Sequence, residues 1–163
     1  MKPKPVLKIR KMKRSDAESV AEMMRALAAS HGDVSKAAAS EFLTRGLGAG
    51  KLATIWLAAH DAAPAGIAAT YDWMNFVRLH PVRHVDLLFV QEPFRRVGVG
   101  SALIKKIVSD AESSGIQRVT VGATKENQAA NGLYRRLGFQ PRDDSSVRYQ
   151  MDCPNFARVG TTA

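Results

Sequence analysis

Two arginines and two glycines are spaced between an apolar segment and an amphipathic one in a way that suits phosphate binding. Arg95 and Arg96 precede Gly98 and Gly100, and the apolar run Leu88–Val90 comes before them. Glycine lets a backbone approach a ligand without a Cβ clash. The first turn of a helix offers unpaired N–H groups at the positive end of the helix dipole. A helix that begins at these glycines would therefore suit a pyrophosphate.

Other interpretations of this loop have different requirements. A Gly-x-Gly pair also occurs in ordinary strand-to-helix turns, so by itself it is a weak signal. A dinucleotide fingerprint would have its third glycine at Leu103 and a carboxylate on a strand about 20 residues later. The strand expected over Arg118–Ala123 carries no carboxylate. A P-loop needs Gly-Lys-Ser/Thr, which the sequence lacks.

The loop and a later segment together resemble the GNAT acetyltransferases. The pattern Arg95-x-x-Gly98-x-Gly100 is similar to the pyrophosphate signature of that family. The later segment reads Asn127-x-x-Ala130-x-x-Leu133-Tyr134, followed by Leu137-Gly138-Phe139. The resemblance covers Val85 to Phe139 in the family's order and spacing. There are two small departures: Arg96 stands where many members have glycine, and Pro93 is one position late.

The resemblance implies both a fold and an activity. The fold class is α/β (α+β), with a central mixed, mostly antiparallel sheet flanked by about four helices. The activity is N-acetyl transfer from acetyl-CoA to a primary amine by direct attack on the thioester, a reaction that needs no metal. The alternative is a module of the same fold that binds acyl-CoA or a protein partner without catalysis, although the presence of Tyr134 and Asn127 favours the enzyme.

The resemblance also assigns the residues that bind the cofactor. Backbone N–H groups from Arg96 through Ser101 would hold the pyrophosphate, and the buried strand would lie beside the pantetheine arm. Asn127 would bind from the next helix, although asparagine is also a good N-cap, and both roles can hold. The expected cofactor set is Leu88, Phe89, Val90, Arg95, Arg96, Val97, Gly98, Val99, Gly100, Ser101 and Asn127.

By the same resemblance, Tyr134 would protonate the departing CoA thiolate. A phenol with an ordinary pKa near 10 is protonated at neutral pH, as a general acid must be. The alternative is a core tyrosine that packs beside Leu133 and Leu137.

Amine attack also needs a base or a water relay to remove a proton. Asp86 is the first candidate, because strand alternation places it on one face with Leu88 and Val90. His84 and His80 are alternatives, since histidine titrates near neutral pH. A satisfied buried carboxylate and edge histidines explain these residues equally well.

Strands and helices alternate in a way that can position these residues. Apolar spacing and turn residues predict a single α/β arrangement of strands with helices packed on them. The expected strands are Val6–Met12, Thr54–His60, Gly66–Phe76, His84–Val90, Arg118–Ala123 and Val147–Cys153. The expected helices run from Ser15 to Gly32, around Phe42, from Gly98 to Ser114 and from Asn127 to Leu137.

Composition and charge limit the remaining possibilities. The 163 residues are 45% hydrophobic, which fits one domain over 1–163 with a basic tail at about 1–5. Seven of the 24 basic residues lie in the first 14, and the rest of the chain is nearly neutral, which disfavours a nucleic-acid partner. We expect no signal peptide and no membrane span. Cys153 is the single cysteine, and cytoplasmic localisation is expected.

The partners implied are acetyl-CoA and an amine acceptor, either a small molecule or a peptide or protein. Tyr71 and Trp73 alternate on one side of their strand and could line the acceptor pocket, although such residues more often serve packing. A homodimer is the family-based expectation, and exposed strand edges offer a route to one.

Overall fold

The computed structural model describes residues 6–35, 38–44 and 52–141. Within these ranges five strands form one sheet in the order β1-β2-β3-β4-β5. The strands are β1 (Leu7–Lys11), β2 (Thr54–His60), β3 (Ala63–Asn75), β4 (His80–Val90) and β5 (Arg118–Val121). The helices are α1 (Ala17–Ser30), α2 (Ala39–Thr44), α3 (Val99–Ser113) and α4 (Gln128–Arg136), with short 3₁₀ turns at Arg14–Asp16 and Glu92–Phe94.

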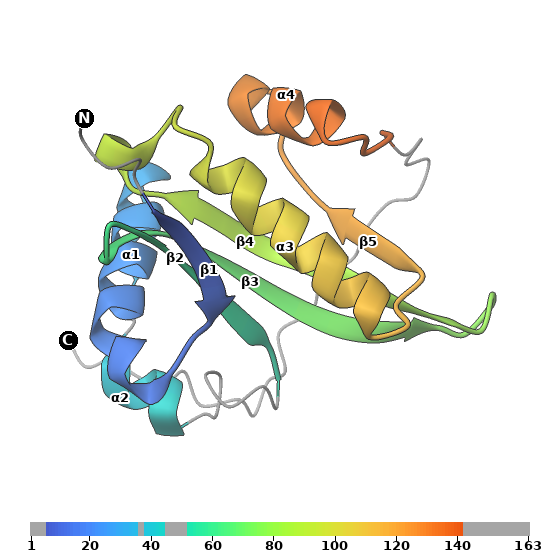
Figure 1. Cartoon of the computed structure of the whole chain (residues 1–163), viewed down its shortest axis with the longest axis horizontal. Coiled ribbons are helices and arrows are strands. Elements are labelled where there is room, and N and C mark those ends of the chain that lie inside the picture. The colour runs from blue at the N-terminus through green and yellow to red at the C-terminus, as the bar shows by residue number, and fades with distance from the viewer. Residues whose placement is uncertain (1–5, 36–37, 45–51, 142–163) are drawn as a thin grey trace.

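The sheet is antiparallel from β1 to β4, and β5 then pairs with β4 in parallel. This change of direction follows from connectivity, because α3 carries the chain back across the sheet between β4 and β5. The expected mixed, mostly antiparallel sheet with four helices is confirmed for the described residues (Figure 1).

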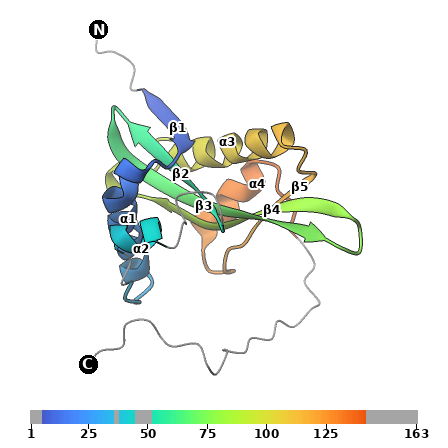
Figure 2. The same cartoon turned by 90° about the horizontal axis from the view of Figure 1, so that it is seen from below.

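Helices cover both faces of the sheet, and each face has its own core. Val20, Ala21 and Met23 of α1 pack on one face, against a group that includes Ile67 and Phe89. On the other face α3 packs through Val99, Leu103, Ile104 and Ile107 onto residues such as Trp56, Ala68 and Val85. Figure 2 shows α1 and α3 on opposite sides of the strands. Leu87 and Phe89 of β4 pack on the α1 side and Leu88 and Val90 on the α3 side, which explains the apolar run at the end of β4.

A β-bulge interrupts β4 near its middle. Ala69 pairs with Leu87 whereas Thr70 pairs with Val85, so Asp86 has no partner in β3. Among the described residues β4 pairs with β5 only from Val82 to Val85. The two parallel strands therefore separate at the bulge, and the β5-facing edge of β4 from Asp86 to Val90 has no strand partner among the described residues.

The other end of β3 and β4 forms a long two-stranded arm. β2 begins opposite Thr70, so β3 residues Tyr71–Asn75 pair only with β4 in the described part of the chain. The arm extends past the end of β2 (Figure 1). Strand β3 also begins earlier than expected, at Ala63. The reason is a two-residue turn in which Asp61 and Ala62 have φ of 48° and 68°, a geometry that matches hairpin twist.

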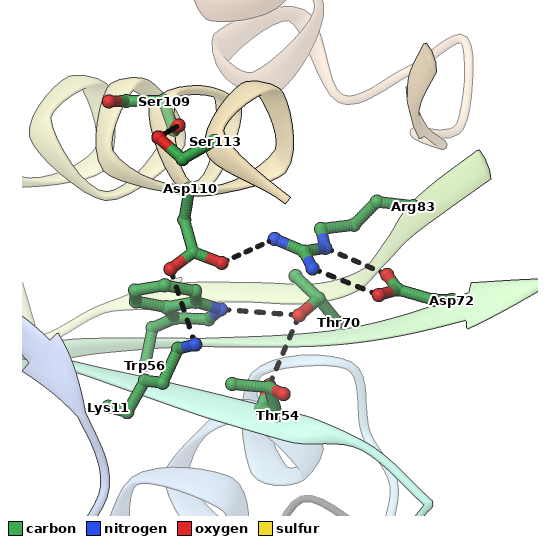
Figure 3. Close-up of polar contacts among 9 residues, drawn as sticks. All are labelled: Lys11, Thr54, Trp56, Thr70, Asp72, Arg83, Ser109, Asp110 and Ser113. Atoms are coloured by element: carbon green, nitrogen blue, oxygen red, sulfur yellow. Dashed lines mark hydrogen bonds and ion pairs between the residues drawn. The ribbon is translucent and has the colours of Figure 1, made fainter. Parts of the chain in front are cut away.

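A buried arginine links the arm to α3 (Figure 3). Arg83 of β4 donates to both carboxylate oxygens of Asp72 at 2.8 and 2.9 Å and to Asp110 of α3 at 2.7 Å. Lys11 of β1 lies 3.2 Å from the same Asp110 carboxylate and stacks over Trp56. Trp56 Nε1 in turn donates to the Thr70 hydroxyl at 3.2 Å. The network joins five elements, β1 to β4 and α3, on one face of the sheet.

No helix among the described residues is long and apolar enough to cross a membrane. The expected strand Val147–Cys153 and the basic tail at 1–5 lie outside the described residues.

Candidate active site

The connection from β4 to α3 has the geometry expected of a phosphate-binding loop. Gly98 is the N-cap of α3 and has a left-handed φ of +93°, which favours glycine. Arg96 has a φ of 66°, in the same region. That backbone conformation explains why glycine is common at this position in the family. The N–H groups of the first turn of α3 have no partner within the helix and are available to an anion.

Side-chain and backbone bonds hold this connection in place. Arg95 Nε donates to the Val90 carbonyl at 3.0 Å, which caps the end of β4. Gln91 is bonded to β3 through its backbone N–H, 2.9 Å from the Ala65 carbonyl, and through its side chain to the Pro64 carbonyl. The loop is therefore anchored to the first residues of β3 and to the end of β4 before α3 begins.

Gly100 is a meeting point of three elements. A Cβ at this position would lie 3.4 Å from Leu133 Cδ2 of α4 and 3.7 Å from Val90 Cγ2 of β4. Glycine therefore lets α4 approach the first turn of α3. Two segments that are far apart in the sequence, the glycine loop and the helix that carries Tyr134, come together above the end of β4.

Tyr134 lies half-buried on α4, against the core that α3 covers. Its ring centroid is 5.9 Å from that of Phe139, and Leu137 packs on the same cluster. Burial raises the pKa of the Tyr134 phenol above its ordinary value, because the charged phenolate is poorly solvated there. The side chain thus has the packing role considered from the sequence and is also held protonated at neutral pH.

Asn127 is the N-cap of α4. Its side-chain oxygen accepts from the Ala130 N–H at 3.1 Å, so the capping role is confirmed. Asn131, which sequence reasoning did not single out, donates to the Thr124 and Asn127 carbonyls at 2.8 and 2.9 Å. These bonds fix the connection between β5 and α4.

The bulge alters the reasoning that selected Asp86. Alternation was expected to place Asp86 on one face with Leu88 and Val90, but the register shift at Asp86 interrupts that alternation. Val85 joins Leu88 and Val90 in the core under α3, and Asp86 is exposed where β4 and β5 separate. Of the two alternatives, His84 Nδ1 lies 2.9 Å from Thr120 Oγ1 of β5, and its ring contacts Tyr71. His80 is buried near the tip of the arm.

The expected cofactor residues are divided between the two faces of β4. Leu88 and Val90 contact the core under α3 and α4, whereas Phe89 points into the core under α1. An open cleft of about 670 Å³ lies on the α1 side and is lined by Phe89, Gln91 and Arg95 together with Glu22 and other residues of α1. Tyr134 and Asn127 do not line this cleft. Over the part of the chain that the structure describes, no group of three His, Cys, Asp or Glu side chains could hold a metal.

Two further residues with a structural role near the site were not identified from the sequence. Gly66 lies opposite Val90, and a Cβ there would be 2.7 Å from the Phe89 carbonyl oxygen and 3.3 Å from Val99 Cγ1. A glycine inside a strand does indicate such an approach. Arg83 fell just outside the strand that was expected to begin at His84, so nothing in the sequence indicated its burial.

The site thus combines a parallel strand pair that separates, a glycine-capped helix beside the separation and a tyrosine-bearing helix packed on the first turn of that helix. Comparison with known proteins identifies the class to which this arrangement belongs. The profile described as Acetyltransferase (GNAT) family matches residues 21–139. The chain therefore belongs to the GNAT acetyltransferase family, a family of acyltransferase enzymes.

Individual relatives differ in what they act on. An uncharacterised N-acetyltransferase of Methanocaldococcus jannaschii is 32% identical over 84 residues, which are 51% of this chain and 37% of that protein. The ribosomal-protein-alanine N-acetyltransferase of Brucella melitensis biovar Abortus 2308 has a TM-score of 0.74 at 21% identity, over 90% of this chain and 100% of its own. An aminoglycoside N-acetyltransferase crystallised with CoA has a TM-score of 0.75 at 20% identity, over 94% and 99%. The two solved structures support the fold.

Proposed function

We propose that the protein transfers an acetyl group from acetyl-CoA to a primary amine by direct attack, with Tyr134 as the general acid. The observation that carries this proposal is the position of α4 at Gly100, which brings the helix of a protonated tyrosine to the open edge of β4 beside the glycine loop. We further propose that one domain carries this activity and that the protein is a cytoplasmic homodimer.

The cofactor would lie along the separation of β4 and β5. The first turn of α3, from Arg96 to Ser101, would bind the pyrophosphate through backbone N–H groups, with Arg95 and Arg96 adding positive charge. The open edge from Leu88 to Val90 would pair with the pantetheine arm as an added strand would. Asn127 would contribute from the start of α4. A structural neighbour of the same fold was crystallised with CoA, which supports CoA as the kind of ligand.

The chain's own groups account for both proton transfers. As the amine nitrogen bonds to the thioester carbonyl carbon, a base removes its proton, and we retain Asp86 for this step because it is exposed where the strands separate. One backbone N–H of the β4 edge would stabilise the oxyanion. When the carbon–sulfur bond breaks, the Tyr134 hydroxyl gives its proton to the thiolate.

A non-catalytic module of the same fold remains the alternative proposal. It would bind acyl-CoA or a protein but would not use Tyr134. The structural neighbours do not indicate one amine substrate for this protein, because one is named for a ribosomal protein and another for aminoglycosides.

Isothermal titration with acetyl-CoA, CoA and NAD tests the cofactor site. We expect micromolar binding of both CoA species, no binding of NAD, and at least tenfold weaker CoA binding by Gly100→Glu, because a carboxylate on the first turn of α3 repels phosphate. Ser113→Glu adds the same charge at the exposed far end of α3 and is the matched control.

The possible results separate the proposals. Folded protein that does not bind CoA would contradict both of them. CoA binding without turnover of any amine in a panel would favour the non-catalytic module.

A further inference from the structure

Within the described residues, the arm of β3 and β4 has an edge with no strand partner and with several exposed apolar side chains. We propose that Tyr71–Asn75 of β3 pairs antiparallel with the same segment of a second copy, which joins two sheets across a two-fold axis. This inference names the surface of the proposed homodimer, and it does not depend on the acetyl-transfer chemistry.

The backbone of this segment is the first part of the case. Pairing with β2 stops at Thr70, so the side of Tyr71–Asn75 that faces away from β4 has no strand partner within the described residues. Native proteins usually protect such an edge with charged side chains, proline or a bulge. The segment Tyr-Asp-Trp-Met-Asn has no lysine, proline or bulge between residues 71 and 75, and its one charge, Asp72, is paired with Arg83.

The side chains on the arm form the second part. Tyr71, Trp73 and Met74 are 40%, 43% and 41% exposed, and Phe76, Val77 and Leu79 at the tip are 80%, 93% and 78% exposed. Because aromatic side chains present about 150–250 Å² each when bare, Tyr71, Trp73 and Phe76 alone expose roughly 300 Å², a substantial part of the ~800 Å² that each partner buries in a standard interface. Leu52, two residues before β2, is 69% exposed as well.

Charge also fits a second copy as the occupant. Asp72 is the one charged side chain of the segment. Both of its carboxylate oxygens accept hydrogen bonds from the Arg83 guanidinium, on the face toward α3. Its carboxylate therefore does not lie across the edge as a protecting charge would. The edge is neutral and apolar, and an identical edge is complementary to it, whereas the acidic or basic surface of a different partner would gain nothing from it.

The length of the open edge sets the register. Five residues of one copy pair fully with five of another only when Trp73 lies opposite itself, Asp72 opposite Met74, and Tyr71 opposite Asn75. No like charges then face each other, and the two Trp73 rings meet on one face as a direct cross-strand pair. The tip of each arm would lie toward Leu52 of the other copy.

Disulfide trapping tests both the contact and its register. Opposed residues in an antiparallel pair have Cα atoms about 4.5–5.5 Å apart, within the range that a disulfide spans. In the full chain with the single native cysteine replaced (Cys153→Ser), we expect Trp73→Cys to form a covalent dimer under mild oxidation. Asn75→Cys alone should remain monomeric on a non-reducing gel, whereas a mixture of Tyr71→Cys and Asn75→Cys chains should cross-link.

Sedimentation of the unmodified chain provides the second readout. We expect a dimer at micromolar concentration, and Trp73→Lys should raise its dissociation constant roughly 30-fold or more, as loss of a central aromatic contact does. Val34→Lys, at a position 83% exposed beyond α1, is the control and should leave the dimer intact. Circular dichroism checks that each variant folds.

A monomeric wild-type chain would overturn the proposal. That is also the result expected if another part of the same chain covers the edge. A dimer that survives Trp73→Lys and does not cross-link through Trp73→Cys would overturn it as well, since the copies would then meet through another surface. Neither result would affect CoA binding, so the proposed activity is judged separately.

Discussion

At the residue scale, the chemistry depends on how the environment of Tyr134 sets its protonation. The side chain packs in a core with Phe139 and Leu137, and that burial raises its pKa. A higher pKa keeps the phenol protonated at neutral pH, so its proton is present when a thiolate leaves. Packing and the proposed general-acid role would therefore both follow from the position of Tyr134.

We expect Tyr134→Phe to lower kcat by roughly 100- to 10,000-fold, the usual contribution of a positioned general acid. The Kd for acetyl-CoA should change little, because phenylalanine keeps the ring in the core. Steady-state kinetics with titration of the cofactor measures both quantities. Ser113→Ala removes a hydroxyl from the exposed far end of α3 and should leave kcat unchanged. If Tyr134→Phe keeps its full kcat, the tyrosine is only a packing residue.

At the scale of elements, the site depends on how closely β3, β4 and α3 approach one another. Gly66 allows this approach because a Cβ would be 2.7 Å from a backbone oxygen, and backbone cannot move aside as a flexible side chain can. The approach fixes the end of β4 and therefore the place where the glycine loop begins.

Gly66→Ala should lower the free energy of unfolding by about 1–3 kcal/mol, the typical effect of overpacking a dense core. Urea denaturation measures this change. Gly122→Ala is the matched control, because a Cβ there meets nothing within 4 Å, and its stability should stay within about 0.5 kcal/mol of wild type. Equal effects of the two substitutions would show that loss of glycine itself, and not the close approach, causes the change.

At the scale of the whole molecule, the Arg83 network fastens α3, β1 and the arm on one face of the sheet. Burial tends to raise the pKa of Asp110, but hydrogen bonds from Arg83 and Lys11 outweigh it and lower that pKa overall. The bonds also raise the pKa of Arg83, chiefly through Asp72. A carboxylate with a lowered pKa in the folded state stabilises the protein above the pKa of the unfolded chain, near 3.9.

Asp110→Asn should therefore cost about 1–3 kcal/mol of unfolding free energy at pH 7. This difference should decrease as the pH falls below about 4, because the wild-type carboxylate then takes up a proton and loses its ionic contacts. Urea denaturation from pH 7 to pH 3 measures the trend. Asp33→Asn, at an exposed site, should show no comparable difference. If the loss of unfolding free energy caused by Asp110→Asn does not change with pH, the effect comes from altered packing or hydrogen bonding and not from the lost charge.

The sequence by itself determined the elements and the loop between them. Apolar spacing and glycines are local signals, so the five described strands, the four described helices and the start of α3 at Gly98 were predicted to within a few residues. The strand expected over Val147–Cys153 stays a prediction. The mixed, mostly antiparallel character of the sheet followed from the resemblance between Val85 and Phe139. The start of β3 was predicted wrongly. The sequence Asp61–Ala65, which contains a proline, indicated a five-residue turn, but the actual turn has only two residues, Asp61 and Ala62, both in the left-handed conformation.

Only the tertiary structure decided which residues meet. The bulge at Asp86 cannot be read from alternation, because it depends on how β3 and β4 fit around the bend in the sheet. The contact of Leu133 with Gly100 and the burial of Arg83 among carboxylates from two elements likewise join positions far apart in the chain. Local propensity fixes where elements form, whereas the packing of whole elements fixes the contacts between them, and the site is made of those contacts.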